Sequence, residues 1–334
     1  MRAAFPRGSF RLTVYILLLA GLALLLTGGE ILVRGSVGAA RSLGVSPMVI
    51  GITLVGFGTS TPELMASVEA AFIGSPGIAI GNVVGSNVAN ILLILGVAAL
   101  IAPITIQRRP LRRDGAVMIA ATVLFGLILA TGYMARWTGF LFILLLIAYV
   151  SYCYWSERNL GEESLQARDA EEIAAPKGPL WRHLLLAIAG LAGVIFGARL
   201  LVDAAINIAR LYEISETVIG VSIVAVGTSL PELAAAVSAS LRRQGDIAFG
   251  NIIGSNIFNI LFILGVTASI KPIPVPQEIL RLDYWVMAGA ALLLIFVSYT
   301  GWKVIRREAA LFLLLYAGYM TLLFSPAARG TFGL

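Results

Sequence analysis

Long apolar stretches separated by short polar segments run along the whole chain. Most of these stretches approach the roughly 20 residues that a helix needs to cross a bilayer. One run, residues 70–107, is too long for a single span and carries a Ser-Pro-Gly turn near its start. The pattern predicts ten membrane-spanning helices, at about residues 12–33, 44–72, 77–101, 115–132, 137–156, 182–202, 213–240, 246–270, 284–301 and 308–325.

A polar segment between the fifth and sixth predicted spans divides the chain into two halves. It is rich in acidic side chains and ends in Pro-Lys-Gly-Pro. Such a composition is typical of a solvated linker, and the segment lacks a loop motif that would favour a regulatory ion site. We therefore predict a five-helix unit at residues 1–156, a linker at 157–180 and a second five-helix unit at 181–334.

Composition and charge agree with a membrane protein. Hydrophobic residues make up 59% of the 334 residues and charged residues 13%, which is too apolar for a soluble domain of this length. The net charge of +6 does not indicate a nucleic-acid partner, because the Lys and Arg side chains lie in short loops between spans. Placing the N-terminus outside puts 15 of the 24 cationic residues on the cytoplasmic side, as the positive-inside rule favours. We expect an all-α, multi-pass protein in the lipid bilayer of the cell (inner or plasma) membrane, with both termini outside and a cytoplasmic linker.

Two motifs occur once in each half, always 169 positions apart. Residues 58–63 (GTSTPE) match residues 227–232 (GTSLPE), and residues 81–90 (GNVVGSNVAN) match residues 250–259 (GNIIGSNIFN). The same offset extends over the regions 51–91 and 220–260 and beyond them, to Asp114 and Asp283. Five spans per half is an odd number, so the second half must enter the membrane in the opposite sense. The two halves are therefore predicted to be inverted-topology repeats, an arrangement found in secondary transporters.

The first motif places a glutamate, Glu63 or Glu232, inside each predicted membrane core. An acidic side chain in hydrocarbon is costly and is seldom there for packing. Ser60 and Ser229 precede the glutamates by three residues, so the structural alternative is a capping box at the start of a half-helix. Hard cations such as Ca²⁺ bind oxygen ligands, and carboxylates, threonine hydroxyls and carbonyls at a helix break supply them. We favour a cation site that the two repeats share, although both roles are compatible.

The second motif places polar side chains at intervals of four residues, on one face of a helix. Its glycines form GxxxG pairs, which allow another helix to approach closely. The structural alternative is that the polar side chains only hold helices together, and we favour ligand roles for Ser86, Asn90, Ser255 and Asn259. For Asn82 and Asn251 the two roles are equally supported. Asn87 and Asn256 are predicted to point elsewhere and to support the helix pair.

Other polar residues are interpreted as structural. Glu30 and Arg34 are four residues apart and predict a salt bridge near the end of a span. His183, the single histidine, falls at a span boundary and is a poor proton relay, and the single cysteine, Cys153, is expected to have a packing role. The sequence shows no phosphate-binding glycine loop, nucleophile–base pair or Cys/His metal cluster, so we expect neither an enzyme nor a cofactor. No obligate protein partner is evident, and a monomer would suffice.

The paired motifs together resemble the α-repeats of the cation/calcium exchanger superfamily, specifically those of short prokaryotic sodium/calcium exchangers. The resemblance extends from the first to the tenth predicted span. It implies a ten-helix fold in which spans two, three, seven and eight form the ion core. It also implies an antiporter that exchanges three Na⁺ for one Ca²⁺ by alternating access, which is an electrogenic exchange.

Position by position, the resemblance implies a set of ion ligands. The calcium site would consist of Glu63, Glu232 and the backbone oxygens of Thr59 and Thr228. Sodium sites would add the side chains of Ser60, Ser86, Ser229 and Ser255 and the carbonyl groups of Gly56 and Ala225. Asn90 and Asn259 would border the central position.

Two details bear on the coupling ion. Asn259 stands where potassium-dependent relatives carry aspartate, which favours potassium-independent exchange. Proton-coupled relatives carry Gly-Asn-Ala-x-Glu where this chain has Gly-Thr-Ser-x-Pro-Glu, which favours sodium. The main alternative is an antiporter of H⁺ and Ca²⁺, or of another divalent cation, that uses the same two glutamates. A passive cation channel and a scaffold with structural carboxylates are weaker alternatives.

Overall fold

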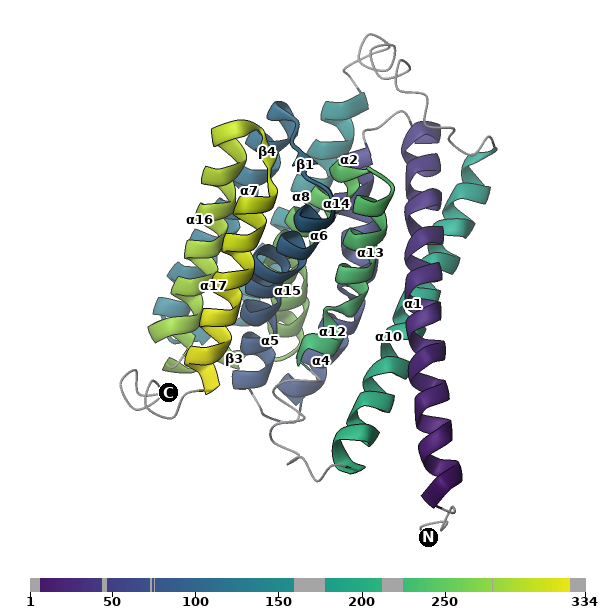
Figure 1. The fold of residues 1–334 in the computed structure, drawn as a ribbon. Coiled ribbons are helices and arrows are strands. Elements are labelled where there is room, and N and C mark those ends of the chain that lie inside the picture. Colours follow the sequence, from purple (N-terminus) through teal and green to yellow (C-terminus); the bar gives the residue numbers. More distant parts are fainter. Residues whose placement is uncertain are drawn as a thin grey trace.

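The computed structural model describes residues 7–43, 47–72, 74, 76–158, 178–211, 225–277 and 279–324. These residues are almost entirely helical, and their helices form one bundle (Figure 1). Seven of the described helical runs are long and apolar enough to cross a membrane. Most of the predicted linker and the start of the predicted seventh span lie outside the described residues. The total of ten spans therefore stays a prediction.

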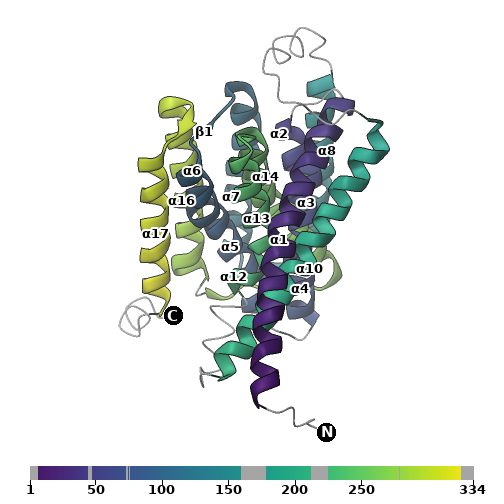
Figure 2. The same cartoon turned by 45° about the vertical axis from the view of Figure 1, so that its right-hand side comes forward.

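Two long helices, α1 (Arg7–Leu43) and α10 (Leu180–Leu211), lie side by side at one edge of the bundle (Figures 1 and 2). Both extend beyond the predicted spans. Glycines seven residues apart line their contact, at positions 28 and 35 of α1 and at positions 190 and 197 of α10. A Cβ atom on Gly28 would lie 2.7 Å from the backbone nitrogen of Val194. The missing side chains therefore let the two backbones meet.

The second and seventh predicted spans are interrupted helices. The second consists of α2 (Pro47–Ile50), the π-helical η1 (Gly51–Val55), α3 (Gly56–Thr59) and α4 (Thr61–Phe72), and the seventh includes α12 (Ala225–Thr228) and α13 (Leu230–Leu241). Ser60 and Ser229 mark the breaks, with ψ close to 5° in both. A proline follows each break in the first turn of the next helix, where its missing N–H group costs no helical hydrogen bond. The proline in each motif thus fixes the point at which a new helix starts.

The third and eighth predicted spans are the runs Pro76–Ile101 and Gly245–Ile270, and their boundaries confirm the prediction within one residue. They consist of α5 (Pro76–Val88), η2 (Ala89–Ile94) and α6 (Leu95–Ile101), and of α14 (Gly245–Phe258), η4 (Asn259–Ile263) and α15 (Leu264–Ile270). The π-helical segments η2 and η4 begin at or next to Asn90 and Asn259. Single π-helical turns are often found at functional sites.

The remaining helices surround this core and show the inverted relation of the repeats. They are α7 (Arg108–Ala130), α8 (Arg136–Arg158), η5 (Ile279–Asp283) with α16 (Tyr284–Gly301), and α17 (Arg306–Phe324). Helix α8 packs against α15 of the other repeat, and α17 packs against α6. The start of α1 and the end of α17 lie at the same end of the bundle (Figure 1).

Two short strand pairs also join the repeats. Strand β1 (Ile104–Thr105) pairs antiparallel with β4 (Lys303–Val304), and β2 (Tyr133–Met134) pairs with β3 (Ile273–Pro274). Each pair joins a loop of one repeat to a loop of the other, and the two pairs lie at opposite ends of the molecule (Figure 1). This is the arrangement expected of two inverted repeats.

The GxxxG pairs of the two repeats differ in their packing. A Cβ atom on Gly254 would lie 2.6 Å from Cα of Ile52, so α14 meets the backbone of η1 at this point. Among the described residues, no atom beyond the adjoining backbone of its own helix lies within 4 Å of a Cβ on Gly81 or Gly85. The predicted close approach is therefore confirmed at Gly254, and no described helix makes it at the first pair.

Candidate cation-binding site

Glu63 and Glu232 lie in the first turns of α4 and α13, directly after the two helix breaks. Each is 1% exposed. The Ser60 hydroxyl donates to Oε1 of Glu232 (3.3 Å), and the Ser229 hydroxyl donates to Oε1 of Glu63 (3.4 Å). Each serine thus contacts the glutamate of the other repeat, and the predicted meeting of the repeats at one site is observed.

Several buried polar atoms of the two glutamates and of the second motif have no hydrogen-bond partner among the described residues. They are Oε2 of Glu63, Oε2 of Glu232, Oγ of Ser255, Oδ1 of Asn259 and both amide atoms of Asn90. Buried polar atoms are almost always paired, so these unpaired atoms make their surroundings a candidate site for a ligand. Hard cations bind such carboxylate, hydroxyl and amide oxygens. The described residues contain no group of three or more His, Cys, Asp or Glu side chains that could hold a metal ion.

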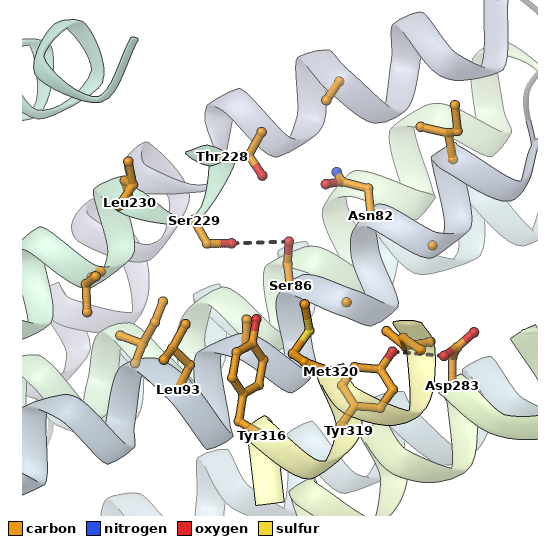
Figure 3. Close-up of a pocket in the computed structure, with 18 residues that line it drawn as sticks. Asn82, Ser86, Leu93, Thr228, Ser229, Leu230, Asp283, Tyr316, Tyr319 and Met320 are labelled. Carbon is orange, nitrogen blue, oxygen red and sulfur yellow. Dashed lines mark hydrogen bonds between the residues drawn. The ribbon is translucent and has the colours of Figure 1, made fainter. Parts of the chain in front are cut away.

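A cavity of about 370 Å³ adjoins the site (Figure 3). The side chains of Asn82, Ser86, Thr228 and Ser229 converge at one part of its wall, where the Ser229 hydroxyl lies 3.5 Å from that of Ser86. Its other lining residues are mostly apolar, apart from Tyr316 and the pair in which the hydroxyl of Tyr319 donates to Asp283 (2.8 Å). The cavity therefore connects Ser86 and Ser229 with the start of α16.

The predicted backbone ligands lie near the breaks. The carbonyl oxygen of Gly56 already accepts the N–H of Ser60 (3.1 Å) and the hydroxyl of Thr59 (3.4 Å). The Thr59 hydroxyl also lies 3.4 Å from Oδ1 of Asn251. Ala225 begins α12, the short helix that ends at Thr228. The roles of these residues as ligands stay predictions.

Asn82 and Asn251 support the glutamates through the main chain. Nδ2 of Asn82 donates to the carbonyl oxygen of Glu63 (3.1 Å), and Nδ2 of Asn251 is 3.5 Å from that of Glu232. Each amide thus ties the helix that carries the glutamate to the following span of its own repeat. The sequence left this role undecided, although the spacing of 19 residues is the same in both halves.

Asn87 and Asn256, which were both predicted to support the helix pair, differ in their contacts. Nδ2 of Asn259 donates to Oδ1 of Asn87 (3.0 Å), so Asn87 contacts a predicted site residue of the other repeat. Asn256 donates to the carbonyl oxygen of Ile252 in its own helix (2.7 Å) and points elsewhere, as predicted. The four-residue spacing could not reveal this difference, because it depends on which helix packs beside α5.

Polar contacts away from the site have structural explanations. Glu30 accepts from Arg34 (2.6 Å), as predicted, and also from Arg242, which links α1 to the end of α13. Sequence reasoning missed a buried cluster in which Asp114 accepts from Arg113 (2.6 Å) and from the hydroxyl of Tyr149 (3.1 Å). The matched aspartates at positions 114 and 283 were a signal for it.

His183 and Cys153 are both buried. The Nε2 atom of His183 lies 3.1 Å from the carbonyl oxygen of Gly178, and its ring packs where a side chain on Gly38 of α1 would lie. The Cys153 thiol is 3.6 Å from Oδ1 of Asp114, so it belongs to the same buried cluster as Tyr149. Neither residue contacts the two glutamates through a described hydrogen bond.

Comparisons with known proteins identify similar sequences over nearly the whole chain. The family model described as sodium/calcium exchanger protein matches residues 13–155 and 182–325, which are the two repeats. The chain is 39% identical to the putative antiporter CaxA of Alkalimonas amylolytica (94% of this chain, 99% of the relative). It is 36% identical to the sodium/calcium exchanger MaX1 of Methanosarcina acetivorans (93% and 98%).

Solved structures show the same fold. The sodium-calcium exchanger NCX_Mj soaked with zero Na⁺ and Ca²⁺ superimposes with a TM-score of 0.80 at 34% identity, over 93% of this chain and 98% of that chain. Among the sequence relatives, the inner membrane protein YrbG of Escherichia coli is 38% identical (81% of this chain, 84% of the relative). With two repeats, apolar spans and matches over nearly its whole length, the chain belongs to the sodium/calcium exchanger family, a family of multi-pass membrane transporters.

Proposed function

We propose that this chain exchanges Na⁺ for Ca²⁺ by alternating access and that both ions bind at Glu63 and Glu232. The observation that carries the proposal is the crosswise contact of two buried glutamates, each with the serine of the other repeat. The unpaired oxygens around them supply ligands of the type that Ca²⁺ and Na⁺ prefer. A relative of similar length is called a sodium/calcium exchanger, which supports this choice of ions.

The ligands divide between the two ions. Ca²⁺ binds the two carboxylates and the backbone oxygens of Thr59 and Thr228. Na⁺ binds Ser60, Ser86 and the carbonyl group of Gly56 in one repeat, and their equivalents Ser229, Ser255 and Ala225 in the other. Asn90 and Asn259 border the central position between the ions. This placement is supported by both amide atoms of Asn90 and Oδ1 of Asn259, which have no partner among the described residues.

The charge of the site favours exchange over leak. Two ionised glutamates give −2, which one Ca²⁺ neutralises and three Na⁺ turn into +1. Moving one net charge across 100 mV corresponds to about 2.3 kcal/mol, so the membrane potential would bias the direction of a three-for-one exchange. An empty site would leave two bare carboxylates in a low-dielectric interior, which disfavours crossing without a cation.

The cytoplasmic side is the end that carries the strand pair β1–β4. Exposed cationic side chains gather there, in β4 and at the starts of α7 and α17, at Arg108, Arg109, Lys303 and Arg306. The positive-inside rule then places both chain ends outside and residues 157–180 in the cytoplasm. The chain acts in the cell membrane, and as a monomer, because both halves of the site belong to one chain.

Calcium uptake into vesicles that contain the purified protein tests the proposal, with sodium, potassium and proton gradients imposed one at a time. We expect an outward sodium gradient alone to drive uptake, to generate a membrane potential, and to need no potassium. Uptake that follows a pH gradient in sodium-free medium would instead identify proton-coupled antiport. Uptake that needs no counter-ion would identify a channel.

A further inference from the structure

The amide of Asn259 is held in one orientation by residues outside the predicted ligand set. Its Nδ2 atom donates to Oδ1 of Asn87 (3.0 Å), whereas its Oδ1 atom has no partner among the described residues. Both side chains are almost completely buried, with 1% of each exposed. One end of the Asn259 amide is therefore fixed, and the oxygen is the end that is left to the site.

A buried thioether determines the orientation of Asn87 in turn. Nδ2 of Asn87 lies 3.4 Å from Sδ of Met287 on α16. A thioether sulfur can only accept a hydrogen bond, so the NH₂ group of Asn87 faces it and the Asn87 oxygen faces Asn259. That oxygen can only accept, and the NH₂ group of Asn259 must therefore turn toward it. This is the arrangement in which the sulfur, the Asn87 amide and the Asn259 amide are all joined by hydrogen bonds.

We propose that Asn87 and Met287 are positioning residues, which present the oxygen rather than the NH₂ group of Asn259 to the transported cation. The inference rests on the proposed function. A cation is attracted by an amide oxygen and repelled by the positive end of the NH₂ dipole, so a freely turning amide would bind it less well. Asn87 acts from the first repeat on a side chain of the second.

The equivalent residues of the other repeat do not form the same hydrogen bonds among the described residues. Asn256 is the equivalent of Asn87, yet it donates to the carbonyl oxygen of Ile252 in its own helix (2.7 Å). Both amide atoms of Asn90, the equivalent of Asn259, are without a partner among the described residues. Only one of the two equivalent amides is thus oriented in advance, and Asn256 provides a matched control position.

Two variants of Asn87 separate positioning from packing. Asn87→Leu removes the acceptor, and we expect the KM for sodium and for calcium to rise about three- to tenfold with little change in maximal flux. Asn87→Asp keeps an acceptor for Asn259, and we expect both KM values to stay within about twofold of wild type. Asn256→Leu should leave both KM values unchanged. If packing were the role of Asn87, the apolar variant would be tolerated better than the charged one, which would overturn the proposal.

A double variant provides the decisive test. Asn259→Asp presents an oxygen whichever way it turns, so adding Asn87→Leu to it should no longer raise KM. An equal rise in both backgrounds would overturn the proposal.

A second measurement needs no transport. Protection of the purified protein against thermal unfolding by Ca²⁺ should rank the variants in the same order. If Asn87→Leu does not fold, Met287→Leu takes its place. Wild-type protein that shows no sodium-driven flux would refute the proposed function, whereas wild-type flux with unchanged KM in Asn87→Leu would refute this inference alone.

Discussion

Replacing either Glu63 or Glu232 with glutamine is expected to abolish sodium-driven calcium uptake. Each carboxylate is buried, contacts the serine of the other repeat and has one oxygen with no described partner. Removing one partner of a buried charged contact costs about 3 kcal/mol or more, which corresponds to roughly a hundredfold loss of calcium affinity. Uptake into vesicles under an outward sodium gradient measures the effect.

Glu308→Gln is the control for these variants. Glu308 accepts the backbone N–H of Ile305 (2.8 Å) at the start of α17, away from the two glutamates. We expect its neutralisation to leave the exchange rate unchanged. Retention of sodium-driven flux by both Glu63→Gln and Glu232→Gln would contradict the assignment of the site.

The second large effect is expected at Gly254. Its Cβ position lies 2.6 Å from Cα and 2.7 Å from the carbonyl oxygen of Ile52, and backbone atoms of a packed helix cannot move away cheaply. Overpacking of this kind typically costs about 1–3 kcal/mol or more. We therefore expect Gly254→Leu to lower the unfolding temperature of the purified protein strongly, or to prevent its folding.

The repeat supplies the matched control for this prediction. Gly85 is the equivalent of Gly254, and no described atom beyond the adjoining backbone of its own helix lies within 4 Å of its Cβ position. Gly85→Leu should therefore leave the unfolding temperature close to that of wild type. Equal destabilisation by the two substitutions would show that the close contact between α14 and η1 does not determine stability at Gly254.

The repeated motifs and the apolar pattern predicted much of the fold and the burial of the two glutamates. The third and eighth spans were located within one residue, and the breaks after Thr59 and Thr228 follow from a proline placed just before each glutamate. Burial of both glutamates follows from the cost of an acid in hydrocarbon. These features depend on residues close together in the sequence, so they can be predicted without knowing which helices pack together.

Features that depend on neighbours were not predicted. Helix α14 is buried on all sides, so its hydrophobic pattern shows no face, and Asn256 could not be told from Asn259 by exposure. The strand pairs β1–β4 and β2–β3 have two residues per strand, too few for an alternating pattern. The contact of Asn87 with Asn259 joins residues 172 positions apart and arises only from the meeting of the repeats.

Calcium binding to the purified protein tests most directly whether the two repeats build one site. Equilibrium dialysis with radioactive calcium in sodium-free buffer gives the number of ions bound per chain. We predict that calcium binding to the wild type is lost on substituting either Glu63→Gln or Glu232→Gln, because both carboxylates hold the same ion. Variants that each keep part of the wild-type calcium at unchanged affinity would contradict the account, since the two glutamates would then serve separate sites.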